Sequence, residues 1–142
     1  MRTRERLNWL FCTGAARPDT LVLGATRGGQ LQGFLVCQDR GWTREVRRRH
    51  VMDVFVPTDD LTVFDALVGE AARRALGARM HTLEFRNLEP VLMARVGTLG
   101  AHPRTLDVNP MLARAVKGGQ ALPCAAADRW SLTPSDGDGA GR

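Results

Sequence analysis

Long apolar runs are missing from this 142-residue chain. No stretch approaches the roughly 20 apolar residues that a helix needs to cross a bilayer. The basic start of the chain is followed by residues 7–12, a segment too short and too polar for the core of a signal peptide. The sequence therefore predicts no membrane partner, and a cytoplasmic location is expected.

Cysteine is scarce: Cys12, Cys37 and Cys124 lie far apart and show none of the paired spacing that zinc sites use. Their odd number and the expected cytoplasmic setting argue against a disulfide framework. Cys37 lies in an apolar run, residues 33–37, which predicts a buried thiol. The histidines fall on separate predicted elements without carboxylates at ligand spacing, so we predict no metal site and a structural or surface role for each histidine.

Isoleucine is absent and Lys117 is the only lysine, although the net charge is +5 and the pI is about 10.4. Clustered cations can neutralise the phosphates of a nucleic acid. The abundant Ala, Gly and Arg are, however, typical of a GC-rich coding sequence, which accounts for much of the basicity. The cations cluster only at residues 40–50, around Trp42, where a solvated hairpin is the simpler interpretation. Nucleic acid is therefore not expected as a partner.

The length of the chain allows one domain with a single core. We assign this domain to residues 1–133 and expect a flexible tail at residues 134–142, because of their composition. Residues 2–12 fit either a short amphipathic helix or an extended entry segment. The predicted strands are residues 20–25, 30–38, 47–56, 79–85, 104–108 and 130–133, and the predicted helices are residues 61–76, 88–99 and 110–116.

The connections between the predicted strands indicate how they pair. Gly28 and Gly29 predict an antiparallel hairpin between the first two strands. Residues 51–56 look buried on both faces, which is typical of a central strand. A single helix separates this strand from the next, so we expect parallel pairing through a right-handed crossover.

Capping residues set the expected ends of the two main helices. Thr58 or Asp59 can cap the first helix, and Gly77 is expected to end it in a left-handed conformation. Asn87 is expected to cap the second helix, with Pro90 in its first turn. The residues expected to pack are Leu61, Phe64, Leu67, Val68, Ala71, Ala72 and Ala75 in the first helix, and Leu88, Val91, Leu92, Val96 and Leu99 in the second.

Two segments carry a resemblance to a known family. Residues 53–56 followed by 65–75 look like a central strand and a CoA-side helix, and residues 83–101 are similar to a strand, Asn, helix, Leu-Gly-Phe segment. This order resembles the GNAT superfamily of N-acetyltransferases, and residues 130–138 resemble those of a bacterial subgroup linked to polysaccharide or cell-envelope gene clusters. The resemblance implies an α/β fold with an α+β mixed sheet: antiparallel strands, a strand-helix-strand-helix unit and two closing strands.

The resemblance also implies a function, transfer of an acyl group from acetyl-CoA or another acyl-CoA to an amine of a small molecule or sugar. In this family a splayed central strand offers amides to the thioester, and the next helix receives the pyrophosphate. Asn87 would sit where a family Asn approaches the CoA arm, although capping its own helix remains open. The other residues that match these roles are Phe55 and Val56 for the strand amides, and Thr58, Asp59, Asp60, Leu61 and Thr62 for the phosphate-facing turn.

The chain departs from the family pattern at several of these positions. The Arg/Gln-x-x-Gly-x-Gly/Ala signature is absent, and Asp59 and Asp60 place negative charge where the pyrophosphate would bind. There is no tyrosine to protonate the departing thiolate, and Val96 stands where it would be expected. Ala101 replaces the aromatic residue after Gly100.

Two alternatives follow from these departures. Asp53 and Glu84 are candidate acid/base groups, although the simpler interpretation of Asp53 is a polar residue with a hydrogen-bond partner, and that of Glu84 is an ion pair with a nearby arginine. Residues 1–19 are too few for the family's first strand and helices, so residues 20–25 are expected to form an exposed edge that a homodimer partner could cover. A non-catalytic GNAT-like binding or assembly domain is therefore the alternative to an acyltransferase.

Overall fold

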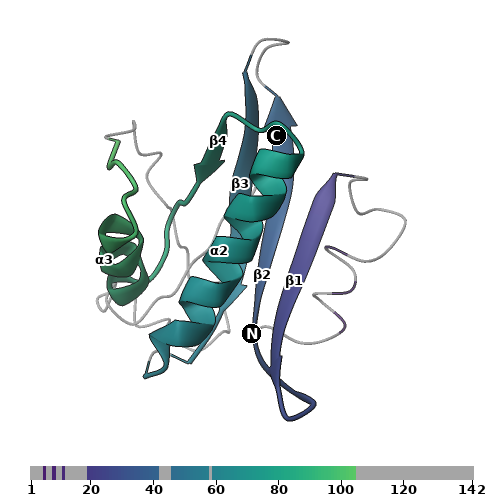
Figure 1. Ribbon diagram of the computed structural model, residues 1–142, viewed down its shortest axis with the longest axis vertical. Helices are drawn as coiled ribbons and strands as arrows, with labels where there is room; N and C mark the ends of the chain where they lie inside the picture. Colours follow the sequence, from purple (N-terminus) through teal and green to yellow (C-terminus); the bar gives the residue numbers. More distant parts are fainter. Residues whose placement is uncertain are drawn as a thin grey trace, which may run out of the picture.

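The computed structural model describes Glu5, Asn8, Phe11 and residues 19–41, 46–57 and 59–104. A four-stranded mixed sheet, in the order β1-β2-β3-β4, carries two helices (Figure 1). This arrangement confirms the predicted mixed sheet and the strand-helix-strand-helix order. The elements are β1 (Thr20–Arg27), β2 (Gln30–Gly41), β3 (Arg47–Phe55), α2 (Leu61–Gly77), β4 (Thr82–Glu84) and α3 (Pro90–Thr98).

The glycine pair forms the predicted hairpin between β1 and β2. Arg27 pairs with Gln30, so the turn has two residues, Gly28 and Gly29, with φ of 58° and 79°. Positive φ at both positions is the type I′ geometry, which matches the twist of antiparallel strands. The hairpin therefore follows from local sequence, and both strands extend beyond their predicted ends.

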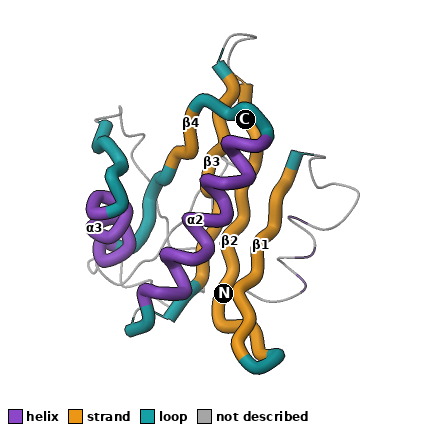
Figure 2. Tube along the Cα trace, viewed as in Figure 1, coloured by secondary structure: helices purple, strands orange, loops and turns teal. Residues whose placement is uncertain are grey.

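β3 is an internal strand, antiparallel to β2 and parallel to β4, as predicted (Figure 2). It contains one extra residue, Met52, because Val36 pairs with Asp53 while Cys37 pairs with Val51. Such a bulge shifts the alternation of side chains by one position. The prediction that residues 51–56 are buried is wrong for Phe55, which is 54% exposed.

Each face of the sheet has its own apolar cluster. α2 lies along one face, as Figure 1 shows, and α3 adds Leu92 and Val96 to the same core. Phe11 packs on the other face against Val36 and Met52. Phe64 is fully buried at the centre of the α2 side, and Cys37 is fully buried there too, as predicted. Burial raises the pKa of the Cys37 thiol to about 12, so the thiol is protonated and unreactive at neutral pH.

The ends of α2 differ from the prediction. Asp60, and neither Thr58 nor Asp59, is the N-cap, and its side chain accepts a hydrogen bond from the Thr62 amide. Gly77 lies inside the helix, and Arg79 adopts the left-handed conformation, with φ of 54°. The amide of Met80 still bonds to the Ala75 carbonyl at 2.9 Å, so residues 78–80 complete the helix end instead of starting a strand. On the helix faces, the prediction that Ala72 packs is wrong, because this residue is exposed, and Val63, which was not among the residues expected to pack, is buried.

β4 and α3 are shorter than predicted. β4 has three residues, because the chain leaves β3 after Glu84. Asn87 does not cap α3: it adopts φ of 53°, and the N-cap is Glu89, which makes no side-chain cap bond. Pro90 occupies the first turn as predicted, and Gly100 ends the segment with φ of 90°. Val91 and Leu99 are exposed rather than packed.

Several predictions lie outside the described residues. They concern the segments 105–108, 110–116 and 130–133, the tail at residues 134–142, and Thr58. Within the part of the chain that the structure describes, no helix combines the length and apolarity needed to cross a membrane.

Candidate functional site

The separation of β3 from β4 is the feature that defines the candidate site. The two strands pair in parallel over three positions, the last of which joins His50 to Glu84. β3 then continues to Phe55 alongside β2, while the chain after β4 turns away toward α3 (Figure 2). From Val51 onward, the β4 side of β3 has no strand partner among the described residues, and His50 and Glu84 mark the point of separation.

Asp53 lies in the separated part of β3, next to the bulge. Its carboxylate accepts a hydrogen bond from the Val54 amide at 2.9 Å, and the residue is 2% exposed. A carboxylate held by a backbone amide stabilises the local strand geometry. Asp53 is thus described more simply as a buried polar residue whose carboxylate has a hydrogen-bond partner. Its acid/base role stays a prediction.

The turn between β3 and α2 brings Asp60 to the start of the helix. The Asp60 carboxylate accepts from the Thr62 amide at 3.2 Å and from the Thr62 hydroxyl, and Arg27 donates to it at 3.2 Å. Hydrogen bonds from Thr62, with help from the Arg27 charge, hold the pKa of Asp60 below its usual range. Helix N-termini attract anions. Here a side-chain carboxylate already makes that contact, and Asp59 beside it is exposed.

The other predicted site residues lie around this turn. Leu61 is partly buried against the core, and Val56 is buried within it. Phe55 stacks on Phe34 with ring centroids 5.9 Å apart. Asn87 is exposed in the connection from β4 to α3. Phe55, Val56 and Leu61 therefore lie around the turn from β3 to α2, whereas Asn87 lies in a different connection.

A polar cluster that the sequence did not reveal surrounds Glu84. Its carboxylate accepts from Arg48 at 3.2 Å and from Arg86 at 3.2 Å, and the His50 Nε2 atom lies 3.4 Å away without forming a hydrogen bond. The predicted alternative, that Glu84 pairs with a nearby arginine, is what the structure contains. A structural or a surface role was predicted for His50. The residue is 5% exposed, so it is not at the surface.

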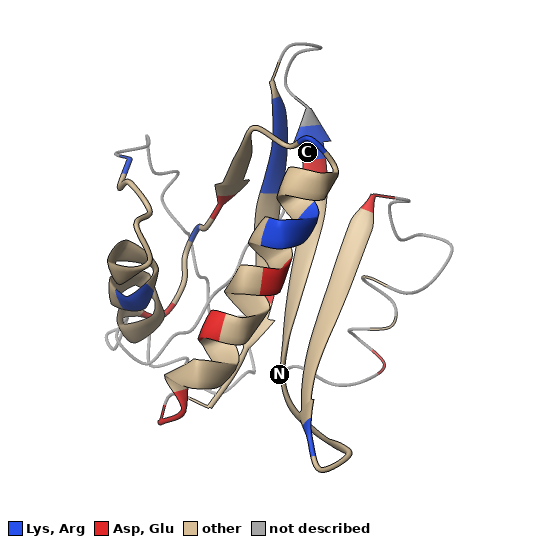
Figure 3. Ribbon diagram, viewed as in Figure 1, with Lys and Arg blue, Asp and Glu red and all other residues tan. Residues whose placement is uncertain are grey.

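The cationic run lies on the predicted hairpin, between β2 and β3, but it is only partly solvated: Arg47 is exposed, whereas His50 is buried. Arg49, on the opposite face from His50, is also buried and pairs with Asp39 through two bonds, of 2.6 Å and 3.0 Å. Figure 3 shows basic residues gathered at this end of β2 and β3. Trp42 and Arg44 lie outside the described residues. Arg48 and Arg49 engage carboxylates of the same fold, which reduces the charge that they offer to a nucleic acid.

His50 should make folding stability depend on pH. Burial lowers its pKa below the ordinary 6.5, and Arg86, Arg40 and Arg48 act in the same direction against Glu84. The unfolded chain therefore takes up this proton first, and the contribution of His50, complete above pH 6.5, is lost as the pH falls below that value. We expect the free energy of unfolding, measured with urea, to fall between about pH 7.5 and pH 5.5. The variant His50→Gln should show a flatter dependence, and an unchanged slope would contradict this assignment.

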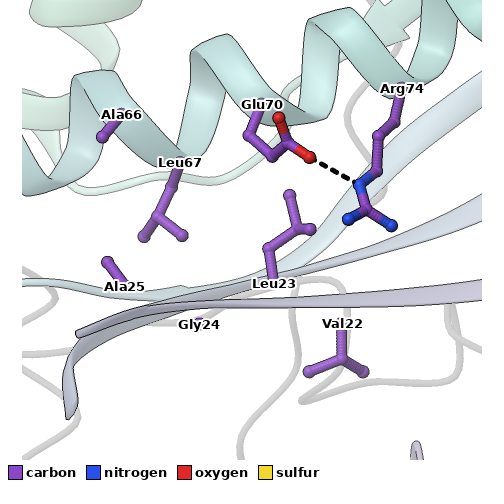
Figure 4. Close-up of a pocket in the computed structure, with 8 residues that line it drawn as sticks. All are labelled: Val22, Leu23, Gly24, Ala25, Ala66, Leu67, Glu70 and Arg74. Atoms are coloured by element: carbon purple, nitrogen blue, oxygen red, sulfur yellow. Dashed lines mark hydrogen bonds and ion pairs between the residues drawn. The ribbon is translucent and has the colours of Figure 1, made fainter. Parts of the chain in front are cut away.

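A cavity of about 370 Å³ lies on the other side of the molecule, between β1 and α2. Figure 4 shows Leu23 and Leu67 pointing toward each other across it, with the bonded pair Glu70 and Arg74 at one end. β1 is the edge strand of the described sheet, and its outer side pairs with no described strand. The predicted exposed edge is therefore present among the described residues.

The fold is shared with acetyltransferases of known structure. No protein-family model matches the chain, and no curated protein matches it in sequence. An aminoglycoside acetyltransferase from an uncultured soil metagenomic sample, in complex with sisomicin, has a TM-score of 0.61 and 12% identity, over 80% of this chain and 76% of that one. A ribosomal-protein-alanine N-acetyltransferase from Brucella melitensis has a TM-score of 0.51 and 19% identity, over 68% and 72% of the two chains. A transcriptional regulator from Bacillus halodurans has a TM-score of 0.58 and 16% identity, over 68% of each. These likenesses show that the chain has the GNAT fold.

Proposed function

We propose that this chain is an acyl-CoA-dependent N-acyltransferase, which moves an acyl group from acetyl-CoA or another acyl-CoA to an amine of a small molecule or sugar. The observation that carries the proposal is the separation of β3 from β4 after His50, along the part of β3 that leads to the turn into α2. An extended thioester arm fits beside a strand whose amides have no partner strand. The acetyltransferase neighbours, which share this fold, support the same reaction class.

In this proposal, catalysis depends on positioning. The separated part of β3 binds the extended acyl-CoA arm, with Phe55 and Val56 beside the portion that leads to α2. The thioester carbonyl lies at the end nearest His50, where a β3 amide stabilises the charge that develops on its oxygen. The first turn of α2, from Asp59 to Thr62, lies near the pyrophosphate. The amine attacks the carbonyl carbon, the C–S bond breaks, and the thiolate takes up the proton that the amine has lost.

His50 is the strongest candidate for removing that proton. Its Nε2 atom lies where the strands separate and makes no hydrogen bond within the described part of the chain. Burial lowers its pKa, so the imidazole is neutral and basic near neutral pH. Asp53 and Glu84 remain candidates of lower rank, because each carboxylate already holds other groups in place.

A calorimetric titration of the full chain with acetyl-CoA tests the proposal. We expect saturable heat at submillimolar ligand, followed by release of free thiol when an amine acceptor is added. The absence of heat at millimolar acetyl-CoA would overturn the proposal.

The charge of Asp60 should weaken acyl-CoA binding, and removing it should have a measurable benefit. Asparagine caps helices as well as aspartate does, so Asp60→Asn keeps the Thr62 contact while removing the negative charge. We expect acetyl-CoA to bind about three- to tenfold more tightly to this variant, because repulsion from the pyrophosphate is lost. Asp60→Ala should gain affinity similarly but unfold at a lower temperature, since the cap is also lost. Unchanged affinity in Asp60→Asn would place the pyrophosphate elsewhere.

A non-catalytic assembly domain is the second candidate. The contact of Asp60 with Thr62 and Arg27 at the start of α2 favours it, because this contact occupies the place of a pyrophosphate. In this alternative, a homodimer forms through the free side of β1, beside the cavity under α2. A measured mass in solution tests it: a strict monomer with no binding partner would remove its support.

A further inference from the structure

Among the described residues, two guanidinium groups, those of Arg48 and Arg86, share one carboxylate where β3 and β4 separate. One carboxylate, that of Glu84, and three guanidinium groups, those of Arg40, Arg48 and Arg86, act on His50. They come from three neighbouring stretches of the sheet: Arg40 from β2, Arg48 from β3, and Glu84 and Arg86 from the end of β4. The side chains of Arg48 and Arg86, 30% and 39% exposed, share the Glu84 carboxylate, so a further anion beside them would be attracted.

Several polar atoms in this cluster are buried and unused. The Nε atoms of Arg48 and Arg86 and the Nε2 atom of His50 have no hydrogen-bond partner within the part of the chain that the structure describes. His50 is itself 5% exposed. Buried donors without partners are rare in proteins, and each one calls for a ligand or another explanation. The two arginine Nε–H groups call for a ligand that supplies acceptors, and the unprotonated His50 Nε2 atom beside them can accept a proton from an amine.

We propose that the acceptor amine carries an anionic group, a carboxylate or a phosphate, and that Arg48 and Arg86 bind this group. The inference rests on the proposed acyl transfer, because it concerns the second substrate of that reaction. An amine that reaches a thioester beside the separated part of β3 must lie next to the last strand pair, His50 and Glu84. The substituent nearest that amine then lies beside the two arginines. Guanidinium groups bind carboxylates and phosphates through paired hydrogen bonds.

The same cluster disfavours a polycationic acceptor. One acetyltransferase with this fold was solved in complex with the aminoglycoside sisomicin. Several ammonium groups beside Arg40, Arg48 and Arg86 would be repelled, because like charges at close range in a partly buried site oppose each other. The acceptor of this chain should therefore differ in charge from that of this structural neighbour.

Three small amines of similar length test the inference on the full chain. Ethanolamine, β-alanine and O-phosphoethanolamine share the amine and differ in carrying a hydroxyl, a carboxylate or a phosphate. We expect calorimetry without acyl-CoA to show binding of the two anionic amines at least about tenfold tighter than that of ethanolamine. The ratio of β-alanine to O-phosphoethanolamine affinity identifies which anion is preferred. Equal binding of all three, or tighter binding of sisomicin, would overturn the inference.

Substitutions locate the anion site. Arg86→Gln and Arg48→Gln should each abolish the preference for the anionic amines, and Arg86→Lys should retain part of it, because lysine keeps the charge and loses the paired N–H groups. Arg73→Gln is the matched control, since Arg73 is exposed on α2 and pairs with Glu70. An unchanged preference in folded Arg48→Gln and Arg86→Gln would contradict the assignment. If a variant fails to fold, the probe comparison on the unsubstituted chain still decides.

The two proposals fail separately. Binding of the anionic amines without binding of acetyl-CoA would remove the acyltransferase proposal and leave the anion site. Binding of acetyl-CoA without any preference for anionic amines would remove the anion site alone.

Discussion

Gly33→Ala should lower the free energy of unfolding by about 2–3 kcal/mol, a typical cost of adding volume to a packed site. A Cβ atom at this position would lie 2.8 Å from the Phe55 carbonyl oxygen, 2.9 Å from Val56 Cγ1 and 3.0 Å from Val63 Cγ1. The backbone oxygen of Phe55 can yield only if the end of β3 moves. Since this strand end leads into α2, acetyl-CoA binding should weaken together with stability.

Gly69→Ala is the matched control for this prediction. Nothing lies within 4 Å of a Cβ atom at Gly69, which is an exposed position of α2. Alanine favours the helix, so this variant should be more stable by about 0.5–1 kcal/mol. Urea unfolding of both variants gives the comparison. A Gly33→Ala protein as stable as the unsubstituted chain would show that β2 and the end of β3 do not pack as described.

Glu84→Gln should also destabilise the fold, by about 2–3 kcal/mol. Removing one partner from a fully buried ion pair costs roughly 3–5 kcal/mol, and the value here is lower because Arg48 and Arg86 keep some contact with water. The substitution leaves both arginines next to His50 without the carboxylate that they share. The larger part of the effect is therefore the cost of unpaired charge rather than the loss of one bond.

Glu70→Gln provides the comparison on the surface of α2. Glu70 accepts from Arg73 and Arg74 at 2.7 Å, and these bonds lower its pKa to about 2, yet all three side chains are exposed to water. Exposed pairs of this kind contribute little to stability. We expect denaturant unfolding to separate Glu84→Gln clearly from Glu70→Gln. Equal stability of the two variants, with loss of turnover only in Glu84→Gln, would show that Glu84 acts in the chemistry and not in holding the arginines.

Local sequence predicts the parts of this fold whose conformation depends on neighbouring residues. Gly28 and Gly29 fix the hairpin, because both positions need positive φ. The apolar spacing of α2 predicts its buried face at Phe64 and Leu67, since the helical period sets which residues share a side. The cap of α2 was assigned incorrectly because Thr58, Asp59 and Asp60 all have capping side chains. Which one is used depends on how the chain leaves β3.

The candidate site depends on contacts that no local pattern contains. His50 and Glu84 meet only because β3 and β4 pair in one particular parallel register. The extra residue Met52 changes which side chains share a face, so strict alternation along residues 51–56 gives the wrong exposure for Phe55. The signal available beforehand was the expected parallel pairing of these two strands. It would have brought Glu84 near the cationic run without identifying its partners.

Hydrogen exchange of the full chain with and without acetyl-CoA tests the central claim most directly, namely that the separated end of β3 binds the thioester arm. We predict slower exchange at the amides of residues 51–56 and in the first turn of α2, with no change in β1. Unchanged exchange at residues 51–56 under millimolar acetyl-CoA, or protection confined to other parts of the chain, would contradict the claim.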